Sequence, residues 1–356
     1  MAAGFDSARA ERFSGKLTDA LDGAALALLT SVGHRTGLFD VMRGLAPATP
    51  AEVAKRAGLV ERYVREWCAA LAAAGVLEHE PESGRYALPA EHAAALTRAA
   101  RPGNLAVAFQ WIPLLGAVED EIVNCFERGG GVPAAAYERF HAVRAEESDQ
   151  SVVAGLLERV LPLVPGLPAA LERGGEVLDV GCGSGRALCR MAEAFPSSRF
   201  VGIDCAPEAI ASARALAREQ GLANVEFRRA DAADFQADDA FDWITAFASI
   251  HRQARPALVL RRIAEALRPE GSFLMQEYAG AGDARADGGR PLATFLYALS
   301  CLQSLPVALA SGGAGLGAMS GESEARRMLA QAGFGHVAVH ALPRDPVHLY
   351  YVARKA

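Results

Sequence analysis

The chain is poor in the features that mark metal-binding, nucleic-acid-binding and membrane proteins. Only six of its 356 residues are cysteine and none has a C-x-x-C spacing, so neither a zinc cluster nor a disulfide framework is expected. Its net charge of -6 gives no basic excess for binding a polyanion. The first residues also lack the apolar run of a secretory signal. We therefore expect a cytoplasmic protein with no metal, no nucleic-acid partner and no membrane partner.

One long stretch contains no charged residue at all. It runs from Pro291 to Gly321 and is long enough for a membrane span. Pro306 interrupts it, however, and a glycine-rich run follows directly. Polar side chains also lie within it, at Ser300, Gln303 and Ser304. A buried helix and loop that cover a pocket are therefore the better interpretation.

The first hundred residues predict a winged helix. Thr49 suits a helix N-cap, Pro50 the first helical position and Gly58 the end of a short helix. Apolar residues recur at helical spacing in 60–77, and 78–88 has the pattern of a hairpin. Helix, turn, helix and hairpin together form a winged-helix domain.

Winged helices commonly bind DNA, so the charge of this segment decides between two functions. From Pro47 to His92, five lysine and arginine residues stand against seven acids, which leaves no basic face for phosphate contacts. We expect residues 1–100 to cap an active site and to form a homodimer. A non-enzymatic, ligand-sensing DNA-binding regulator is the alternative. Residues 101–170 are expected to form a helical connector.

From Glu176 onward, strand patterns alternate with helical patterns. This order predicts an α/β fold, a doubly wound, Rossmann-like sheet in a domain of residues 171–356 with an insert at 280–320. Two antiparallel strands joined around 343–346 are expected to complete it. The predicted parallel strands are 176–180, 199–204, 224–230, 241–247 and 272–278.

The first of these strands runs into a glycine-rich loop in the sequence EVLDVGCGSG. Its glycines are Gly181, Gly183 and Gly185, whereas a dinucleotide fingerprint reads G-x-G-x-x-G and would need a further glycine where Arg186 stands. In an open parallel sheet the ligand binds beyond the carboxyl ends of the strands, where glycines let it approach the backbone. The spacing therefore argues against a pyrophosphate ligand.

Three acids at strand ends describe the ligand instead. Asp204 ends the second strand, where a carboxylate can accept from both hydroxyls of a ribose, and Asp231 ends the third, where it can accept from an adenine amino group. Asp179 can face an ammonium group directly or through water. An amine, a diol and an adenine without a phosphate describe S-adenosylmethionine. Beside this cofactor we also expect Cys205, Ala232 and Phe247.

These motifs resemble the class I S-adenosylmethionine-dependent methyltransferases, whose cofactor motifs match EVLDVGCGSG, FVGID and RRADAADF. Nearly the whole chain also resembles a bacterial subfamily of small-molecule methyltransferases with an N-terminal winged helix, known from mycobacteria. That likeness is carried by WIPLLGAVEDEIVNCFERGGGVP, LYALSCLQSLPVALASGGAGLGAM and LPRDPVHLYYV. The resemblance implies methyl transfer to an oxygen, nitrogen or carbon nucleophile of a small-molecule acceptor.

Several pocket positions depart from the subfamily pattern. FASIHRQ stands where the subfamily has F-D-A-I-H-D-Q, so Ala248 and Arg252 replace two acids. Gln303 lies where the subfamily reads M-H-C-M, and His348 replaces an asparagine. These departures leave two hypotheses open. The protein uses a substrate that differs from the subfamily's, or it uses the same cofactor for a different displacement or cyclisation.

His251 is the candidate general base, because the loop after the fourth strand lies over the methyl group in this fold and imidazole titrates near neutral pH. The alternative is that it only hydrogen-bonds within its loop. Glu277 is a candidate substrate ligand or second base. A sulfonium repels a cation, so Arg252 either points away or meets a substrate carboxylate. The further substrate candidates are His141, Glu146, Gln303 and His348.

Overall fold

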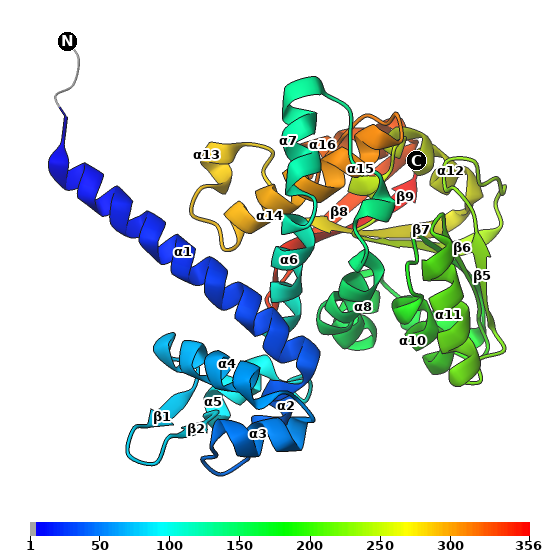
Figure 1. Cartoon of the computed structure of the whole chain (residues 1–356). Helices are drawn as coiled ribbons and strands as arrows, with labels where there is room; N and C mark the ends of the chain where they lie inside the picture. The colour runs from blue at the N-terminus through cyan, green and yellow to red at the C-terminus, as the bar shows by residue number, and fades with distance from the viewer. Residues whose placement is uncertain (1–4) are drawn as a thin grey trace. The chain divides into compact units, whose positions relative to one another are not determined.

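The computed structural model describes residues 5–356, which divide into two compact units after Gly116 (Figure 1). This division falls inside the connector predicted for 101–170. Its first part belongs to the amino-terminal unit, and residues 117–170 belong to the carboxyl-terminal unit.

The amino-terminal unit is a helical domain with one small hairpin. Its short helix α3 has the predicted ends, because Thr49 and Glu52 form a reciprocal capping box, Pro50 is the first helical residue and Gly58 is left-handed. The Trp67 indole also donates to the Leu29 carbonyl over 2.9 Å, which ties α1 to α4. The winged helix is confirmed. The elements are α1 (Ser7–Thr36), α2 (Leu38–Met42), α3 (Pro50–Ala57), α4 (Glu61–Ala73), β1 (Glu78–Glu80), β2 (Arg85–Ala87), α5 (Ala90–Leu96), η1 (Leu105–Gln110) and α6 (Trp111–Gly116).

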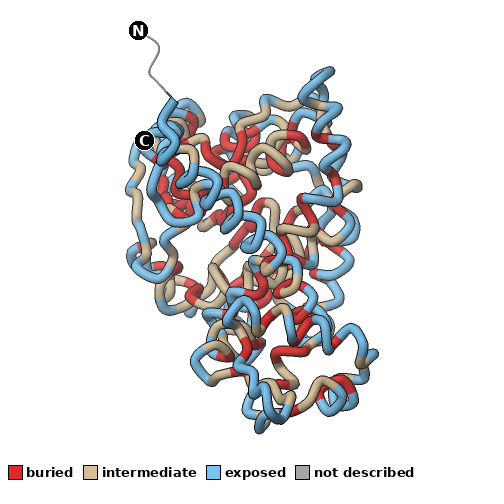
Figure 2. Tube along the Cα trace, turned by 60° about the vertical axis from the view of Figure 1, so that its left-hand side comes forward, coloured by how far each residue is buried: buried red, intermediate tan, exposed pale blue. Residues whose placement is uncertain are grey.

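Helix α1 is buried only toward its carboxyl end, and most of its length is exposed (Figure 2). Four large apolar side chains stand on the exposed part at a spacing of four or seven residues. A 3.6-residue period places such side chains on one face of a helix. They are Phe13, Leu17, Leu21 and Leu28.

The carboxyl-terminal unit contains a seven-stranded sheet of order β5-β4-β3-β6-β7-β9-β8. The first five strands in this order pair in parallel, and β9 pairs antiparallel with β7 and β8. The sheet's switch point therefore lies between β3 and β6, where a ligand crevice is expected. The strands are β3 (Glu176–Val180), β4 (Arg199–Asp204), β5 (Val225–Arg229), β6 (Phe241–Phe247), β7 (Leu267–Tyr278), β8 (Phe334–Leu342) and β9 (Asp345–Lys355).

Helices precede the sheet, alternate with its strands and form the insert. All the predicted strands are present, and β7 begins five residues early because Leu267 pairs with Phe241 ahead of an irregularity in the ladder. The helices are α7 (Glu119–Arg128), η2 (Ala134–Ala136), α8 (Phe140–Gln150), η3 (Val153–Gly155), η4 (Leu156–Val160), η5 (Leu161–Leu163), α9 (Leu167–Arg173), α10 (Arg186–Ala194), α11 (Pro207–Glu219), η6 (Ile250–Arg252), α12 (Pro256–Ala266), α13 (Ala284–Asp287), α14 (Ala293–Leu299), η7 (Ser300–Ser304), α15 (Leu305–Ala310) and α16 (Gly321–Gln331).

The uncharged stretch forms one continuous helical run, Ala293–Ala310, through α14, η7 and α15. Within residues 5–356 this run and a bent pair, 140–163 with 167–173, are apolar and long enough to cross a membrane. Core helices of soluble proteins pass the same test, so this is weak evidence for a span. The run contributes Gln303 and Val307 to the wall of a cavity, as expected of a segment that covers a pocket.

Candidate active site

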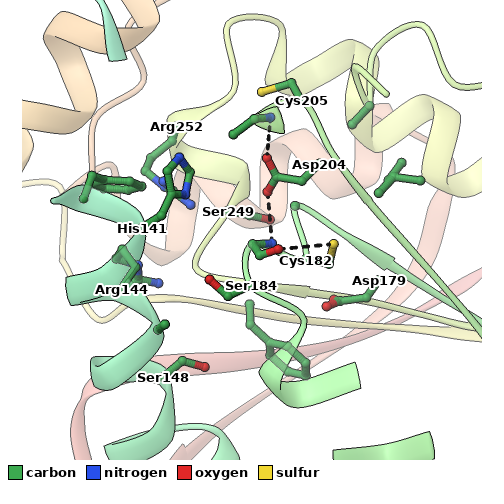
Figure 3. Close-up of a pocket in the computed structure, with 18 of the residues that line it drawn as sticks. His141, Arg144, Ser148, Asp179, Cys182, Ser184, Asp204, Cys205, Ser249 and Arg252 are labelled. Atoms are coloured by element: carbon green, nitrogen blue, oxygen red, sulfur yellow. Dashed lines mark hydrogen bonds between the residues drawn. The ribbon is translucent and has the colours of Figure 1, made fainter. Parts of the chain in front are cut away.

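A cavity of about 190 Å³ lies at the carboxyl ends of β3, β4 and β6, at the switch point of the sheet (Figure 3). The loop after β3 forms one wall, and α8 faces it from the opposite side. Phe247, at the end of β6, and Ala232 also line the cavity, as predicted. All of these residues belong to the carboxyl-terminal unit.

The three glycines of the loop have different reasons for being glycine. Gly183 lines the cavity with a φ of +53°, and a Cβ there would meet nothing within 4 Å. Gly181 also lines it, but a Cβ on that residue would lie 2.6 Å from the Ser249 Cβ. Gly185 does not line the cavity, because it packs against the Phe227 ring, 2.5 Å from the position of its missing Cβ. Its packing accounts for this glycine, and its predicted contact with the cofactor stays a prediction.

Asp204 connects the glycine loop to the start of α11. One carboxylate oxygen accepts from the Gly183 N–H over 3.0 Å, and the other accepts from the Ala206 N–H over 2.9 Å (Figure 3). A carboxylate has about four acceptor positions, so this one can still accept from a diol while it holds the loop. Asp204 and Cys205 both line the cavity, as predicted.

Asp179 is buried at the base of the cavity, at 3% exposure. The Thr245 hydroxyl donates to its carboxylate over 2.7 Å. Burial raises the pKa of Asp179 to about 7; the bond from Thr245 opposes this shift, and the charge of Asp204 adds to it. A cation placed next to Asp179 would shift it back toward the ionised form.

Asp231 is not among the residues that line the cavity, although its neighbours Ala230 and Ala232 are. Its carboxylate instead accepts from the Ala233 N–H over 2.8 Å and from the Arg255 guanidinium over 3.3 Å. The side chain is half exposed. Its bond to an adenine stays a prediction, which requires the carboxylate to turn away from Arg255.

His251 and Glu277 form a buried pair outside the cavity wall. The His251 Nδ1 lies 2.5 Å from one Glu277 oxygen, while the other oxygen accepts from the Ile250 and His251 N–H groups over 2.9 and 3.3 Å. The pair borders a second hollow of about 10 Å³ next to Tyr278. The structure thus places both predicted catalytic residues behind the cavity, and their catalytic role stays a prediction.

The electrostatics of this pair favour a neutral imidazole beside an ionised carboxylate. Burial lowers the pKa of His251, Glu277 opposes this shift, and the charges of Arg252 and Arg144 add to it, so the pKa lies below its usual value. Burial raises the pKa of Glu277, but His251 and the two backbone N–H groups outweigh this and leave that pKa below its usual value. His251 therefore donates its Nδ1 proton to Glu277 and leaves Nε2 unprotonated.

Helix α8 supplies polar groups to the cavity on one face. His141, Arg144 and Ser148 line it (Figure 3), and the His141 ring lies beside Arg252. Glu146 does not line it, because five residues beyond His141 a helix has turned to a different face. Sequence reasoning missed Arg144 and Ser148, although their spacing of three and seven residues from His141 was the signal that could have found them.

Arg252 lines the cavity, and both alternatives for its side chain, pointing away from the sulfonium or meeting a substrate carboxylate, stay predictions. Its guanidinium lies over the Phe140 ring, 4.9 Å from the centroid, and its Nε donates weakly to the Ala248 carbonyl over 3.4 Å. It makes no ion pair with any residue between 5 and 356. Burial and the neighbouring Arg144 lower the pKa of Arg252.

The two remaining substrate candidates separate. Gln303 lines the cavity and is buried. His348 does not line it, because its Nδ1 pairs with Asp345 over 2.8 Å and its ring stacks on Tyr278 with centroids 4.9 Å apart. His348 therefore belongs to the buried polar region around β7 and β9, not to the cavity wall.

Two family models match the chain. Residues 24–98 match the Rv2258c-like winged HTH domain, and residues 171–333 match a methyltransferase domain. The chain thus combines these two domains, and its fold is that of the class I S-adenosylmethionine-dependent methyltransferases.

Curated relatives are similar over part of their length. A trans-aconitate 2-methyltransferase of Acidovorax ebreus is 32% identical over 142 residues, which are 40% of this chain and 48% of that protein. A nocamycin O-methyltransferase of Saccharothrix syringae is 40% identical over 116 residues, 32% of this chain and 39% of that protein. The chain therefore spans less than half the length of these relatives.

Solved structures are similar over the whole chain. The mitomycin 7-O-methyltransferase MmcR superposes with a TM-score of 0.71 at 19% identity, covering 99% of this chain and 100% of that one. Human N-acetylserotonin methyltransferase, solved with S-adenosylmethionine, superposes with a TM-score of 0.68 at 18% identity and covers both chains completely. At these identities the likeness establishes the fold.

Proposed function

We propose that this chain binds S-adenosylmethionine in the cavity and transfers its methyl group to an oxygen of a small-molecule acceptor. The observation that carries the proposal is the Gly183–Asp204 bond, which forms an open glycine cradle beside a carboxylate at the switch point of a methyltransferase domain. Names among the relatives support the reaction class: trans-aconitate 2-methyltransferase, nocamycin O-methyltransferase and fatty-acid O-methyltransferase.

The donors and acceptors of the cavity fit the parts of this cofactor. Asp204 would hold the ribose hydroxyls and Asp179 the ammonium group. Arg144 and Ser148, on the opposite wall, would donate to the cofactor's own carboxylate. When bound, S-adenosylmethionine supplies an electrophilic methyl group on a sulfonium.

The chain's own residues would orient the acceptor and exclude water from the displacement reaction. Phe140 and Val307 border the cavity with apolar surface, which excludes water and holds the acceptor near the methyl group. For a hydroxyl acceptor, the unprotonated Nε2 of His251 is the predicted proton acceptor. That role requires the His251–Glu277 pair to open toward the cavity.

Product analysis tests the proposal. Purified protein incubated with labelled S-adenosylmethionine and the candidate acceptors should give a methylated product and an equal amount of S-adenosylhomocysteine. A product formed without methyl transfer would support the alternative displacement or cyclisation. Failure to bind S-adenosylhomocysteine, measured by calorimetry, would contradict the proposal as a whole.

We also propose that the protein is a cytoplasmic homodimer in which the exposed apolar face of α1 pairs with its copy in a second chain. The face is formed by Phe13, Leu17, Leu21 and Leu28, and an exposed stripe of this kind marks an interaction surface. Leu17→Asp combined with Leu21→Asp should yield monomers in sedimentation experiments. Asp19→Ala, on the opposite face of the helix, should leave the dimer intact; monomeric wild-type protein would contradict the proposal.

The winged helix is proposed to cap the active site and not to bind DNA. On α4 the exposed Arg62 and Arg65 are paired with Glu66 and Glu61, which leaves little positive charge for phosphates. A gel-shift titration should show no salt-dependent complex with duplex DNA. A complex that weakens steeply with salt would support the regulator alternative.

A further inference from the structure

Arg252 is a cation at the cavity wall that makes no ion pair with any of residues 5–356. Arg144, which lies on the same side of the cavity, pairs with Glu147. Arg252 has instead an aromatic face, that of Phe140, and one weak bond to a backbone carbonyl. An enclosed guanidinium is stabilised by an anion that reaches it in the cavity.

The carboxylates that line the same cavity form hydrogen bonds with groups other than Arg252. Asp204 holds the glycine loop and the start of α11, and Asp179 is buried beneath Thr245. The loop that carries Arg252 also contains no acidic residue, because position 248 is an alanine with only a methyl side chain. The missing anion must therefore arrive with a ligand.

We propose that the methyl acceptor is a carboxylic acid, with Arg252 contacting one carboxylate oxygen and the other oxygen receiving the methyl group. This inference rests on the proposed function and narrows its substrate class. A carboxylate between Arg252 and the cofactor also separates two positive charges that would otherwise repel each other. With a neutral acceptor, Arg252 would only repel the sulfonium of the cofactor. With an ionised acid, Arg252 attracts the acceptor.

The reaction balances without a proton acceptor. A lone pair of the carboxylate oxygen forms a bond to the methyl carbon, the carbon–sulfur bond breaks and its electron pair remains on sulfur. The carboxylate and the sulfonium lose their charges together, which gives a methyl ester and S-adenosylhomocysteine. No proton is released, so the reaction is compatible with a His251 that stays paired with Glu277 behind the wall.

In this reaction His251 and Glu277 are positioning residues. Glu277 accepts from the backbone of Ile250 and His251, directly before Arg252, and so holds the segment that presents the guanidinium. For a carboxylic acid that is already ionised, turnover should not depend on a group with the pKa of an imidazole. This assignment would be contradicted by a turnover rate that depends on pH with the pKa of an imidazole in the wild type and no longer does so in Glu277→Gln.

Binding to three matched probes tests the acceptor class. Benzoate, benzamide and benzyl alcohol have the same ring and similar size, and only benzoate is an anion. Titrated into protein saturated with S-adenosylhomocysteine, benzoate should bind roughly tenfold more tightly than either neutral probe. Arg252→Ala should remove this preference, whereas Arg190→Ala, at a surface arginine of α10 that pairs with Glu193 outside the cavity, should keep it.

The label on the product gives a second measurement. Methyl groups transferred from labelled S-adenosylmethionine to a panel of carboxylic acids should be released as methanol by mild alkali, which cleaves esters. Alkali-stable label, as in an ether or a methylated amine, would overturn the inference.

The outcomes separate this inference from the proposed function. If wild-type protein binds no S-adenosylhomocysteine, the proposed function fails. If it binds S-adenosylhomocysteine but binds the three probes equally, or none of them at millimolar concentration, only the acid acceptor is overturned. If Arg252→Ala instead weakens S-adenosylhomocysteine binding and leaves the benzoate preference, Arg252 holds the cofactor's own carboxylate and the inference is wrong.

Discussion

The two halves of the sheet's carboxyl edge are built differently. Around β3 and β4, a glycine loop and Asp204 face an open cavity, and their contacts are mostly with backbone groups nearby. Around β6 and β7, His251 and Glu277 form a closed pair behind the wall. The first half is arranged to receive a ligand, whereas the second is arranged to hold a segment that carries Arg252. In the proposed function, cofactor binding and acceptor recognition therefore depend on different physical interactions.

The largest effect is expected from a substitution that breaks the buried His251–Glu277 pair. His251→Ala removes both a buried ring and its hydrogen bond to the ionised Glu277 carboxylate, and should lower the free energy of unfolding by about 3–5 kcal/mol. Thermal and denaturant unfolding measure this loss. Glu277→Gln is the matched control, because a neutral amide still accepts from the two backbone N–H groups and costs less. A loss below about 1 kcal/mol in His251→Ala would show that the pair is not closed in solution.

The next largest effect is expected from a substitution in the open cavity, at Asp204. Asp204→Ala removes the acceptor for the Gly183 N–H and for the predicted ribose contact, so the affinity for S-adenosylhomocysteine should fall by roughly 100-fold. Asp204→Asn keeps one carbonyl oxygen and should lose roughly tenfold. Calorimetry on both variants checks the order. Unchanged affinity in Asp204→Ala would place the cofactor elsewhere.

A smaller effect concerns pH, through Asp179. Its pKa of about 7 is raised by burial, and a bound ammonium group favours its ionised form. Binding therefore releases a proton below this pKa, and affinity should rise by up to roughly tenfold per pH unit until it levels off above pH 7. Asp179→Asn should remove this dependence in titrations at several pH values. An affinity that falls as the pH rises would contradict the assignment.

The same shift has the opposite sign for stability. A carboxyl with a raised pKa stabilises the folded protein in its protonated form. This contribution is complete below the unfolded pKa and is lost as the pH rises through about 7. Ligand-free protein should therefore lose part of its stability between pH 4 and pH 7 in the wild type and less in Asp179→Asn, as unfolding experiments would show.

The sequence predicted the strands and the glycine loop around β3 and β4 well because their signals are local. The strand from Glu176 and the glycines after it are adjacent in the chain, and Asp204 had to lie nearby because the carboxyl ends of parallel strands meet at one edge. Side-chain direction was less predictable. Gly185 and Asp231 follow the correct strands, yet one packs against Phe227 and the other turns to Arg255.

The amino-acid sequence by itself determined the winged helix, the positions of the strands along the chain and the acids at the strand ends, because caps, periodicity and glycine spacing act between neighbouring residues. Tertiary structure alone decided which side chains reach the cavity. His251 meets Glu277 from a different strand end, and the face of α8 that carries Arg144 lies across the cavity from the glycine loop. Such choices depend on how separate elements fit together, which no local pattern encodes.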